Sequence, residues 1–322
     1  AVELLLGALH DAAPLVQWKA AHALRSLHTR ALVPPERLVF HEGAVFDRWK
    51  AGVLAHLAQD LADPDPAVRL EAAASLGEIA DATTLPALLG AAFDSVPPVR
   101  WEVRSAILTL AARDPHLREA SRRYLSPLLH EGDPLVRSTG ADLLGRLGDW
   151  AAMPALLPLL HDADEAVRRV ACLALGRLGD HGAVEALVGR LADDAPGVRE
   201  AAAAALGHIG DPYAVTPLVH VRGDEAPVVR QAVAAALLRI DRTVGMPVLL
   251  GALGDSDPGT RLAAVDLLGA VGDAQAVKAL GRLARDRAVV GTRQVGPEAK
   301  AARTAIRKRL RAPAGAEGGP QA

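Results

Sequence analysis

Pairs of a histidine and an adjacent acid are the residues in this sequence with the clearest potential to bind a metal ion. His10-Asp11, His130-Glu131 and His161-Asp162 occupy one position of a repeated pattern, and His41-Glu42 lies outside that pattern. Imidazole and carboxylate groups are common ligands of zinc and iron. Adjacent side chains on a helix point in directions about 100° apart, so such a pair rarely shares one ion. We therefore expect no metal site and no cofactor.

A second candidate for chemistry is a series of acids and arginines. The dipeptide Val-Arg recurs along the chain, and Val16-Gln17 and Thr260-Arg261 take its place in two repeats. An acid stands six residues before the second residue of each of these dipeptides. Partners that return in every unit of a chain more often make structural hydrogen bonds than active sites. We therefore predict that stacking brings each acid near an arginine of a neighbouring repeat. The acids are Asp11, Asp63, Asp94, Glu131, Asp162, Asp193, Asp224 and Asp255.

The remaining composition gives no sign of an enzyme. The sequence has no phosphate-binding loop, nucleophile elbow or zinc-protease motif, and its one cysteine, Cys172, falls among alanines and leucines, where a buried thiol is inert. A net charge of -2 gives no global positive field that would attract nucleic acid or an anionic membrane. The single cysteine fits a reducing compartment, and we expect a cytoplasmic protein without direct membrane insertion.

The elements that carry these residues repeat with a period of 31 residues. The step is 31 residues four times in succession between Arg137 and Arg261, and it is 37 residues between Arg100 and Arg137. From Gln17 to Arg69 it is 52 residues. We expect the two insertions, of 6 and 21 residues, to lie in connecting loops.

Each repeat has the pattern of two antiparallel helices, A and B. Helix B begins at the Val-Arg step, and its apolar residues are spaced as on one helical face. A glycine inside helix B indicates close approach of a neighbouring helix, as at residues 77, 145, 176, 207 and 269. Left-handed glycines are predicted after the helix at Gly148, Gly179, Gly210 and Gly272. N-caps of the next helix are predicted at Asp149, Asp180, Asp211 and Asp273.

A single repeat is too small to fold alone, so each must bury its apolar face against the next. The unit "DDAPGVREAAAAALGHIGD" at 193–211 resembles the short HEAT-like repeat of the bilin-lyase type, which is also used in artificial helical-repeat binders. The resemblance implies an all-α, right-handed solenoid over residues 1–311, with about eight helix pairs and a terminal helix from Pro297. It implies an armadillo-like superhelix and leaves the function open.

The known enzymes with similar repeats do not match this chain at their sites. Deoxyhypusine hydroxylase carries His-Glu pairs on its B helices, but the corresponding positions here hold Leu70-Glu71, Trp101-Glu102 and Glu200-Ala201. Nothing in the sequence identifies a chromophore site of the bilin-lyase type. Both enzyme interpretations therefore rest on the resemblance alone.

A stripe on the B helices is the candidate binding surface. Positions one, five and nine after each arginine project away from the faces that pack, and B helices line the concave side of such solenoids. The stripe has an apolar end at Trp18, Leu70 and Trp101 and a basic middle at Arg146, Arg169, Arg177 and Arg239, with His208 between. Exposed tryptophan and arginine are enriched at interface hot spots. Alternatively, the tryptophans are covered by an insertion and the arginines are solvated.

Two further segments interrupt the pattern. The insertion at 31–50, with its loop at about 31–47, carries Phe40, Phe46 and Trp49 and either folds back on the first repeats or contacts a partner. The basic run at 307–311 ends a helix, where it favours the negative pole of the helix dipole. The Gly- and Pro-rich tail at 312–322 is predicted to be disordered.

We therefore expect a non-enzymatic scaffold or adaptor that binds a protein, or another domain of a longer chain, on the concave B-helix face. The chain begins at Ala1 inside an apparent helix, which indicates a part of a longer protein. Nucleic-acid binding through the arginine stripe is the alternative, but Glu78, Asp142, Glu200 and Asp266 interrupt that stripe, so we do not expect nucleic acid as a partner. A metal or bilin enzyme is the third possibility.

Overall fold

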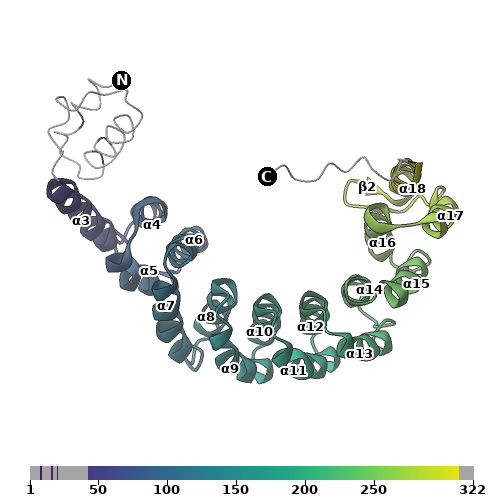
Figure 1. Ribbon diagram of the computed structural model, residues 1–322, viewed down its shortest axis with the longest axis horizontal. Helices are drawn as coiled ribbons and strands as arrows, with labels where there is room; N and C mark the ends of the chain where they lie inside the picture. Colours follow the sequence, from purple (N-terminus) through teal and green to yellow (C-terminus); the bar gives the residue numbers. More distant parts are fainter. Residues whose placement is uncertain (1–7, 9–15, 17–19, 21–42, 312–322) are drawn as a thin grey trace. The chain divides into compact units, whose positions relative to one another are not determined.

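The computed structural model describes residues 8, 16, 20 and 43–311 and divides into two compact units, Ala1–Leu125 (unit 1) and Ser126–Ala322 (unit 2). Both units are built from paired helices (Figure 1). The predicted tail at 312–322 and most of the predicted loop at 31–47 lie outside the described residues. None of the helices in the described ranges has the length and apolar character that a membrane span requires.

Unit 1 contains two B helices that pack side by side, α4 against α6. The preceding A helices α3 and α5 contact α4 and α6, respectively. In chain order the elements are α3 (Gly43–Asp60), α4 (Pro66–Ile79), the 3-10 helix η2 (Ala82–Thr84), α5 (Leu85–Ala91), α6 (Pro97–Arg113) and α7 (Pro115–Leu128), which continues into unit 2.

Both insertions differ from their prediction as loops. Helix α3 begins at Gly43, so residues 43–47 of the expected loop are helical. The extra six residues between Arg100 and Arg137 lengthen helices: α6 has 17 residues where α4 has 14, and α7 has 14 where α5 has seven. The extension of α6 keeps an apolar face, since Leu110 and Ala111 in its last turn are buried. Helical extension also satisfies the added backbone groups, which a loop would leave to solvent.

Unit 2 arranges its helices in two curved layers, with the B helices on the concave side (Figure 1). Each B helix contacts the next one along the chain, through to the terminal helix. The B helices are α8 (Pro134–Leu147), α10 (Glu165–Leu178), α12 (Pro196–Ile209), α14 (Pro227–Ile240), α16 (Pro258–Val271) and α18 (Val295–Arg311). The outer layer contains α9 (Met153–Leu156), α11 (Val184–Gly189), α13 (Val215–His220), α15 (Arg242–Ala252) and α17 (Ala274–Leu283), with short 3-10 helices at several ends.

The turns after the B helices follow the predicted chemistry in three of the four repeats. Gly148, Gly179 and Gly210 adopt φ angles of 65°, 70° and 77°. Gly272 does not; its φ of -63° is ordinary, and a side chain there would collide with Ile306 of α18 and with Leu268. Glycine is needed at this position because a Cβ would lie only 2.5 Å from the carbonyl oxygen of Leu268 and 2.9 Å from Cδ1 of Ile306. The next element is N-capped in every case by the aspartate that follows, at Asp149, Asp180, Asp211 and Asp273.

The core of unit 2 is aliphatic and repeats with the sequence. In each B helix from α8 to α16 the leucine at one repeat position is fully buried, at residues 144, 175, 206, 237 and 268. The glycine that follows this leucine permits close approach, because a Cβ on Gly176 would lie only 2.7 Å from the Cα of Ala205. Gly145 and Gly207 make the same approach to the next B helix. The predicted close approach is wrong for Gly77, whose Cβ would meet only Ala106 at an ordinary 3.9 Å.

The terminal repeat contains a small departure from the all-α pattern. Between α17 and α18, β1 (Val289–Val290) pairs with β2 (Arg293–Gln294) as an antiparallel hairpin around the left-handed Gly291. The terminal helix begins at Val295, two residues before the predicted Pro297. Its buried residues pack on the cluster formed by α14 to α17, so the last repeat is closed by α18.

Candidate functional site

The repeated acids and arginines form a ladder between adjacent repeats, as the sequence predicts. In α4, α8, α10, α12, α14 and α16 the arginine donates from Nε to Oδ2 of the aspartate 25 residues later, at 2.6–2.9 Å. Arg100 of α6 donates only to the carbonyl oxygens of Asp94 and Ser95, so the series omits the predicted acid Glu131. The last rung, Arg261–Asp286, extends the series one acid beyond those predicted. The rungs are Arg69–Asp94 in unit 1 and Arg137–Asp162, Arg168–Asp193, Arg199–Asp224, Arg230–Asp255 and Arg261–Asp286 in unit 2.

Each ladder arginine also holds the turn before its own helix. Arg199 donates from Nη1 to the carbonyl oxygens of Asp193 and Asp194, at 2.9 and 3.1 Å. Its hydrogen bonds to Asp224 lower the pKa of that carboxyl group, although burial of Asp224 acts in the opposite direction. The polar atoms of the ladder are therefore satisfied within the fold, which makes the ladder structural.

The predicted stripe lies on the B helices of the concave layer in unit 2 (Figure 1). The side chains nine residues after each ladder arginine form one row, Arg146, Arg177, His208 and Arg239, and all four are exposed. Arg169, one position after its ladder arginine, is exposed as well. The structure therefore presents all five predicted stripe residues of unit 2 to solvent.

Only some of these arginines are free to meet a partner's charge. The carboxylate of Asp142 accepts from Nε of Arg146 at 2.9 Å and from Nη1 of Arg177 at 2.8 Å. Asp142 thereby links α8 to α10 and neutralises part of the row. Arg169 and Arg239 have no ion pair with any described residue. The available positive charge of the stripe is therefore concentrated at Arg169 and Arg239.

The middle row of the stripe is smaller and less polar. Leu173, Ala204 and Ala235 are half-buried between the helices. Leu262, which the pattern places on the stripe of α16, is 6% exposed and belongs to the core of the terminal repeat. Position one of α16 is therefore not part of the surface.

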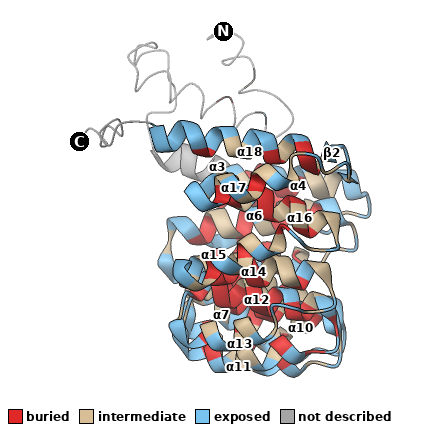
Figure 2. Cartoon of the chain, turned by 90° about the vertical axis from the view of Figure 1, so that its right-hand side faces the viewer, coloured by how far each residue is buried: buried red, intermediate tan, exposed pale blue. Residues whose placement is uncertain are grey.

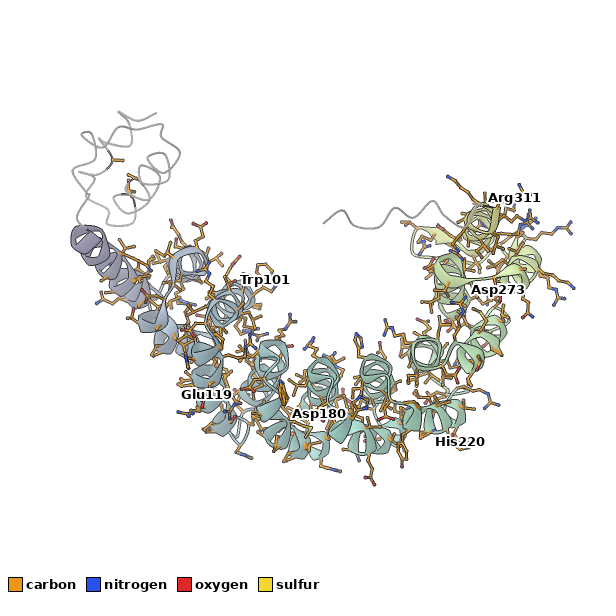
Figure 3. The ribbon with its side chains drawn as sticks, in the orientation of Figure 1. Trp101, Glu119, Asp180, His220, Asp273 and Arg311 are labelled. Carbon is orange, nitrogen blue, oxygen red and sulfur yellow. The ribbon has the colours of Figure 1, made fainter. Side chains whose placement is uncertain are left out.

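In unit 1 the stripe is represented by Leu70 and Trp101. Leu70 is half-buried, whereas Trp101 is 68% exposed and projects from the side of α6 away from α5 (Figure 3). Within the described residues nothing covers Trp101, and most of the insertion that was the predicted cover lies outside them. Trp18 and Phe40 lie outside those residues, as do the side chains of Phe46 and Trp49.

Three exposed aromatics among the described residues were not predicted from the sequence: Tyr124 on α7, Trp150 and Tyr213. Trp150 and Tyr213 are 73% and 63% exposed at the turns between a B helix and the next A helix. The described core is built from alanine, leucine and valine, so aromatic residues are placed on the surface instead. The sequence signal for the exposure of Trp150 and Tyr213 was their position one or two residues after a capping aspartate. At that turn no neighbouring helix buries the side chain.

Of the histidine and acid pairs, the structure describes His130-Glu131 and His161-Asp162, whereas His10-Asp11 and His41-Glu42 lie outside the described residues. The carboxylate of Asp162 is occupied by Arg137, so His161 has no acid partner in its own pair. Within residues 43–311, no three side chains of histidine, cysteine, aspartate or glutamate come close enough to hold a metal ion. Cys172 is fully buried in α10, and burial raises the pKa of its thiol to about 12.

Comparison with known proteins agrees with this architecture. The sequence model of the family described as HEAT repeats matches residues 54–122, 122–207, 153–238 and 221–295. No curated protein matches the chain. The solved structure of Kap95p with RanGDP is similar in fold, with a TM-score of 0.61 at 13% identity over 95% of this chain and 47% of that one.

Two other solved structures have a higher sequence identity to this chain than Kap95p but a lower TM-score. An engineered protein is 23% identical with a TM-score of 0.40, over 95% of this chain and 88% of its own. The CpcE and CpcF complex of phycocyanin lyase from Nostoc sp. PCC7120 is 21% identical with a TM-score of 0.41, over 79% of this chain and 94% of that one. The expectation of an all-α solenoid of HEAT-like repeats is confirmed.

Proposed function

The chain belongs to the family of HEAT-repeat proteins, and from this premise we propose that it is a non-enzymatic scaffold that binds a protein on the concave face of its B helices. The partner is a separate protein or another domain of a longer chain. We also propose a cytoplasmic location, which the buried free thiol of Cys172 supports.

The observation that carries this proposal is the pair of unpaired arginines on a rigid layer. Arg169 and Arg239 are exposed on α10 and α14, and neither is neutralised by a described acid. Between them, Leu173, Ala204 and Ala235 form a half-buried apolar row. An apolar centre with a charged border is the usual composition of a protein interface.

The ladder supports the same proposal through preorganisation. Helices α8, α10 and α12 are each fixed to the next repeat by a two-point ion pair and by a contact between glycine and alanine. A surface carried by such a frame loses little conformational entropy when a partner binds.

Nucleic-acid binding through the stripe is less favoured by this geometry. A phosphate backbone requires a continuous positive groove. Asp142 accepts hydrogen bonds from two of the stripe arginines. Glu200, on the helix between those of Arg169 and Arg239, is exposed and adds a negative charge. The stripe is therefore mixed in charge, which suits a protein surface better than a polyanion.

The test is quantitative recovery of partners from extracts of the source cells. The bait is the full chain, compared with the variant R169A/R239A and with R222A, which removes an exposed arginine near the outer helix α13. We expect the concave variant to recover the specific partner at no more than about a tenth of the wild-type level, and R222A to recover it fully. Equal recovery by all three baits would place the binding surface elsewhere.

A further inference from the structure

The last repeat of unit 2 carries many more cations than acids. Residues 274–311 hold eleven lysines and arginines and only two acids, although the whole chain carries a net charge of -2. The two acids are already engaged, because Asp286 pairs with Arg261 and Glu298 pairs with Arg293. The rest of the chain is net negative, so this end differs in sign from the remainder.

Two helical stripes present these cations to solvent. The apolar side of α17 is buried through Ala276 and Leu280, and that of α18 through Ala299 and Ile306. Six of the exposed cations of this repeat make up what we name the terminal basic face: Lys278 and Arg282 on α17, Arg285 just after it, and Lys300, Arg307 and Arg311 on α18.

The two stripes belong to one surface. Helix α17 packs along α18, and Nη1 of Arg303 lies 3.1 Å from the position that a Cβ on Gly281 would occupy. Arg303 therefore reaches from α18 across α17. Helix α18 lies at the end of the unit, with exposed residues on its outer side, and Arg311 is at its C-terminal end (Figures 2 and 3).

Closure of the solenoid does not account for this composition. A terminal repeat needs a polar outer face, but acids serve that purpose as well as bases do. None of the six cations has a carboxylate partner among the described residues. The dipole of α18 explains basic residues in its last turn only, and there Arg309 instead bonds the carbonyl oxygens of Gly269, Ala270 and Gly272 in α16.

The chemistry of the face favours phosphate groups on a duplex. Arginine, the more frequent cation here, forms two-point hydrogen bonds with phosphate oxygens. Residues 274–311 contain no aromatic side chain, which protein interfaces use as anchors and which single-stranded nucleic acids use for stacking. Insertion into a membrane surface would need the apolar side of α18, and that side is buried in the repeat.

We propose that the terminal basic face binds the phosphate backbone of double-stranded nucleic acid without regard to sequence. This site is separate from the concave stripe and does not depend on the proposed protein partner. The overall net charge of -2 gives no reason to expect nucleic acid as a ligand. A local site is still possible because the excess of positive charge lies on one repeat.

The experiment measures binding of the full chain to a labelled DNA duplex of about 20 base pairs by fluorescence anisotropy, between about 50 and 200 mM salt. We expect affinity to fall steeply with salt. The variant R282Q/R307Q/R311Q should bind about tenfold more weakly or worse, with a salt slope reduced by about 0.9 for each lost contact. The control R113Q/R123Q/R222Q removes three exposed arginines elsewhere and should bind as wild type.

Two outcomes would overturn the proposal. The first is a failure of the duplex experiment: either the wild-type chain does not bind the duplex at low salt, or the two triple variants are weakened equally. Circular dichroism verifies that both variants are folded. The other is binding to vesicles containing phosphatidylserine with no binding to the duplex, since that result would assign the face to a membrane surface.

Discussion

Arg199 and Asp224 form a two-point ion pair between adjacent repeats, with Nε to Oδ2 at 2.8 Å and Nη2 to Oδ1 at 2.9 Å. Arg199 is 8% exposed, and its remaining hydrogen bonds go to the turn of its own repeat. One side chain thus links three segments: the turn after α11, helix α12 and the turn after α13. The same relationship along unit 2 gives the stack its fixed register.

Removal of one ladder carboxylate is expected to destabilise unit 2 markedly. Asp224→Asn keeps the shape but leaves Arg199 without its counter-charge in a buried position, at a cost of about 3 kcal/mol. Urea unfolding followed by circular dichroism measures the effect. Asp266→Asn is the matched control, because the Asp266–Arg293 pair is about half exposed and its loss should not change the midpoint measurably.

The glycines inside the B helices are expected to be intolerant of alanine. Gly176→Ala would place a Cβ 2.7 Å from the Cα of Ala205, so α10 and α12 must separate, at a cost of about 1–3 kcal/mol. Gly251→Ala in α15 meets no atom within 4 Å and should stabilise the protein by about 0.5–1 kcal/mol. A lower melting temperature for Gly251→Ala than for Gly176→Ala would contradict the proposed role of close helix contacts.

Stability is expected to fall in acid because of the ladder. Burial raises the pKa of Asp193, but hydrogen bonds from Arg168 and from the backbone of Ala195 outweigh it and lower the pKa to about 2. Arginine hydrogen bonds likewise lower the pKa values of Asp162, Asp224 and Asp255.

A carboxyl group with a depressed pKa in the folded state stabilises the fold above its unfolded pKa of about 3.9. That contribution is lost as the pH falls from about 4 toward 2. Thermal melts across this range measure the slope, which Asp193→Asn should make shallower. A pH-independent melting temperature over the same range would show that the ladder contributes little.

The single thiol is expected to be unreactive in the folded protein. Burial raises the pKa of Cys172 to about 12, so almost no thiolate exists at about pH 8. Ellman's reagent should label no thiol in the native chain and one thiol in concentrated guanidinium chloride. Rapid native labelling would indicate that α10 opens locally.

Much of the fold follows from the repetition in the sequence, because a side chain that recurs every 31 residues meets its copy in a neighbouring repeat. The rungs from Arg137 to Asp255 and the capping aspartates are of this kind. Sequence reasoning failed where a repeat lacks regular neighbours. Gly272 is crowded by the carbonyl oxygen of Leu268 and by Ile306 of the terminal helix, and the extra residues near Arg113 extend α6 where a loop was expected.

The surface was less predictable than the core for a physical reason. Burial of Leu206 follows from packing that every repeat shares, whereas exposure of Trp150 depends on the absence of a neighbour at one turn. The cations of the terminal basic face were individually visible in the sequence. Their assembly depends on α17 and α18 lying side by side, which only the structure supplies.

The most direct test of the central claim is site-specific photocrosslinking in the source cells. A photoreactive residue is placed at Glu200 or His208 on the concave layer, which leaves Arg169 and Arg239 in place, and at Glu185 or His220 on the outer layer, where Figure 3 shows His220. We predict a discrete protein adduct from both concave positions and none from the outer ones. Adducts of equal yield from both layers, or from the outer layer alone, would contradict a scaffold that binds its partner on the concave face.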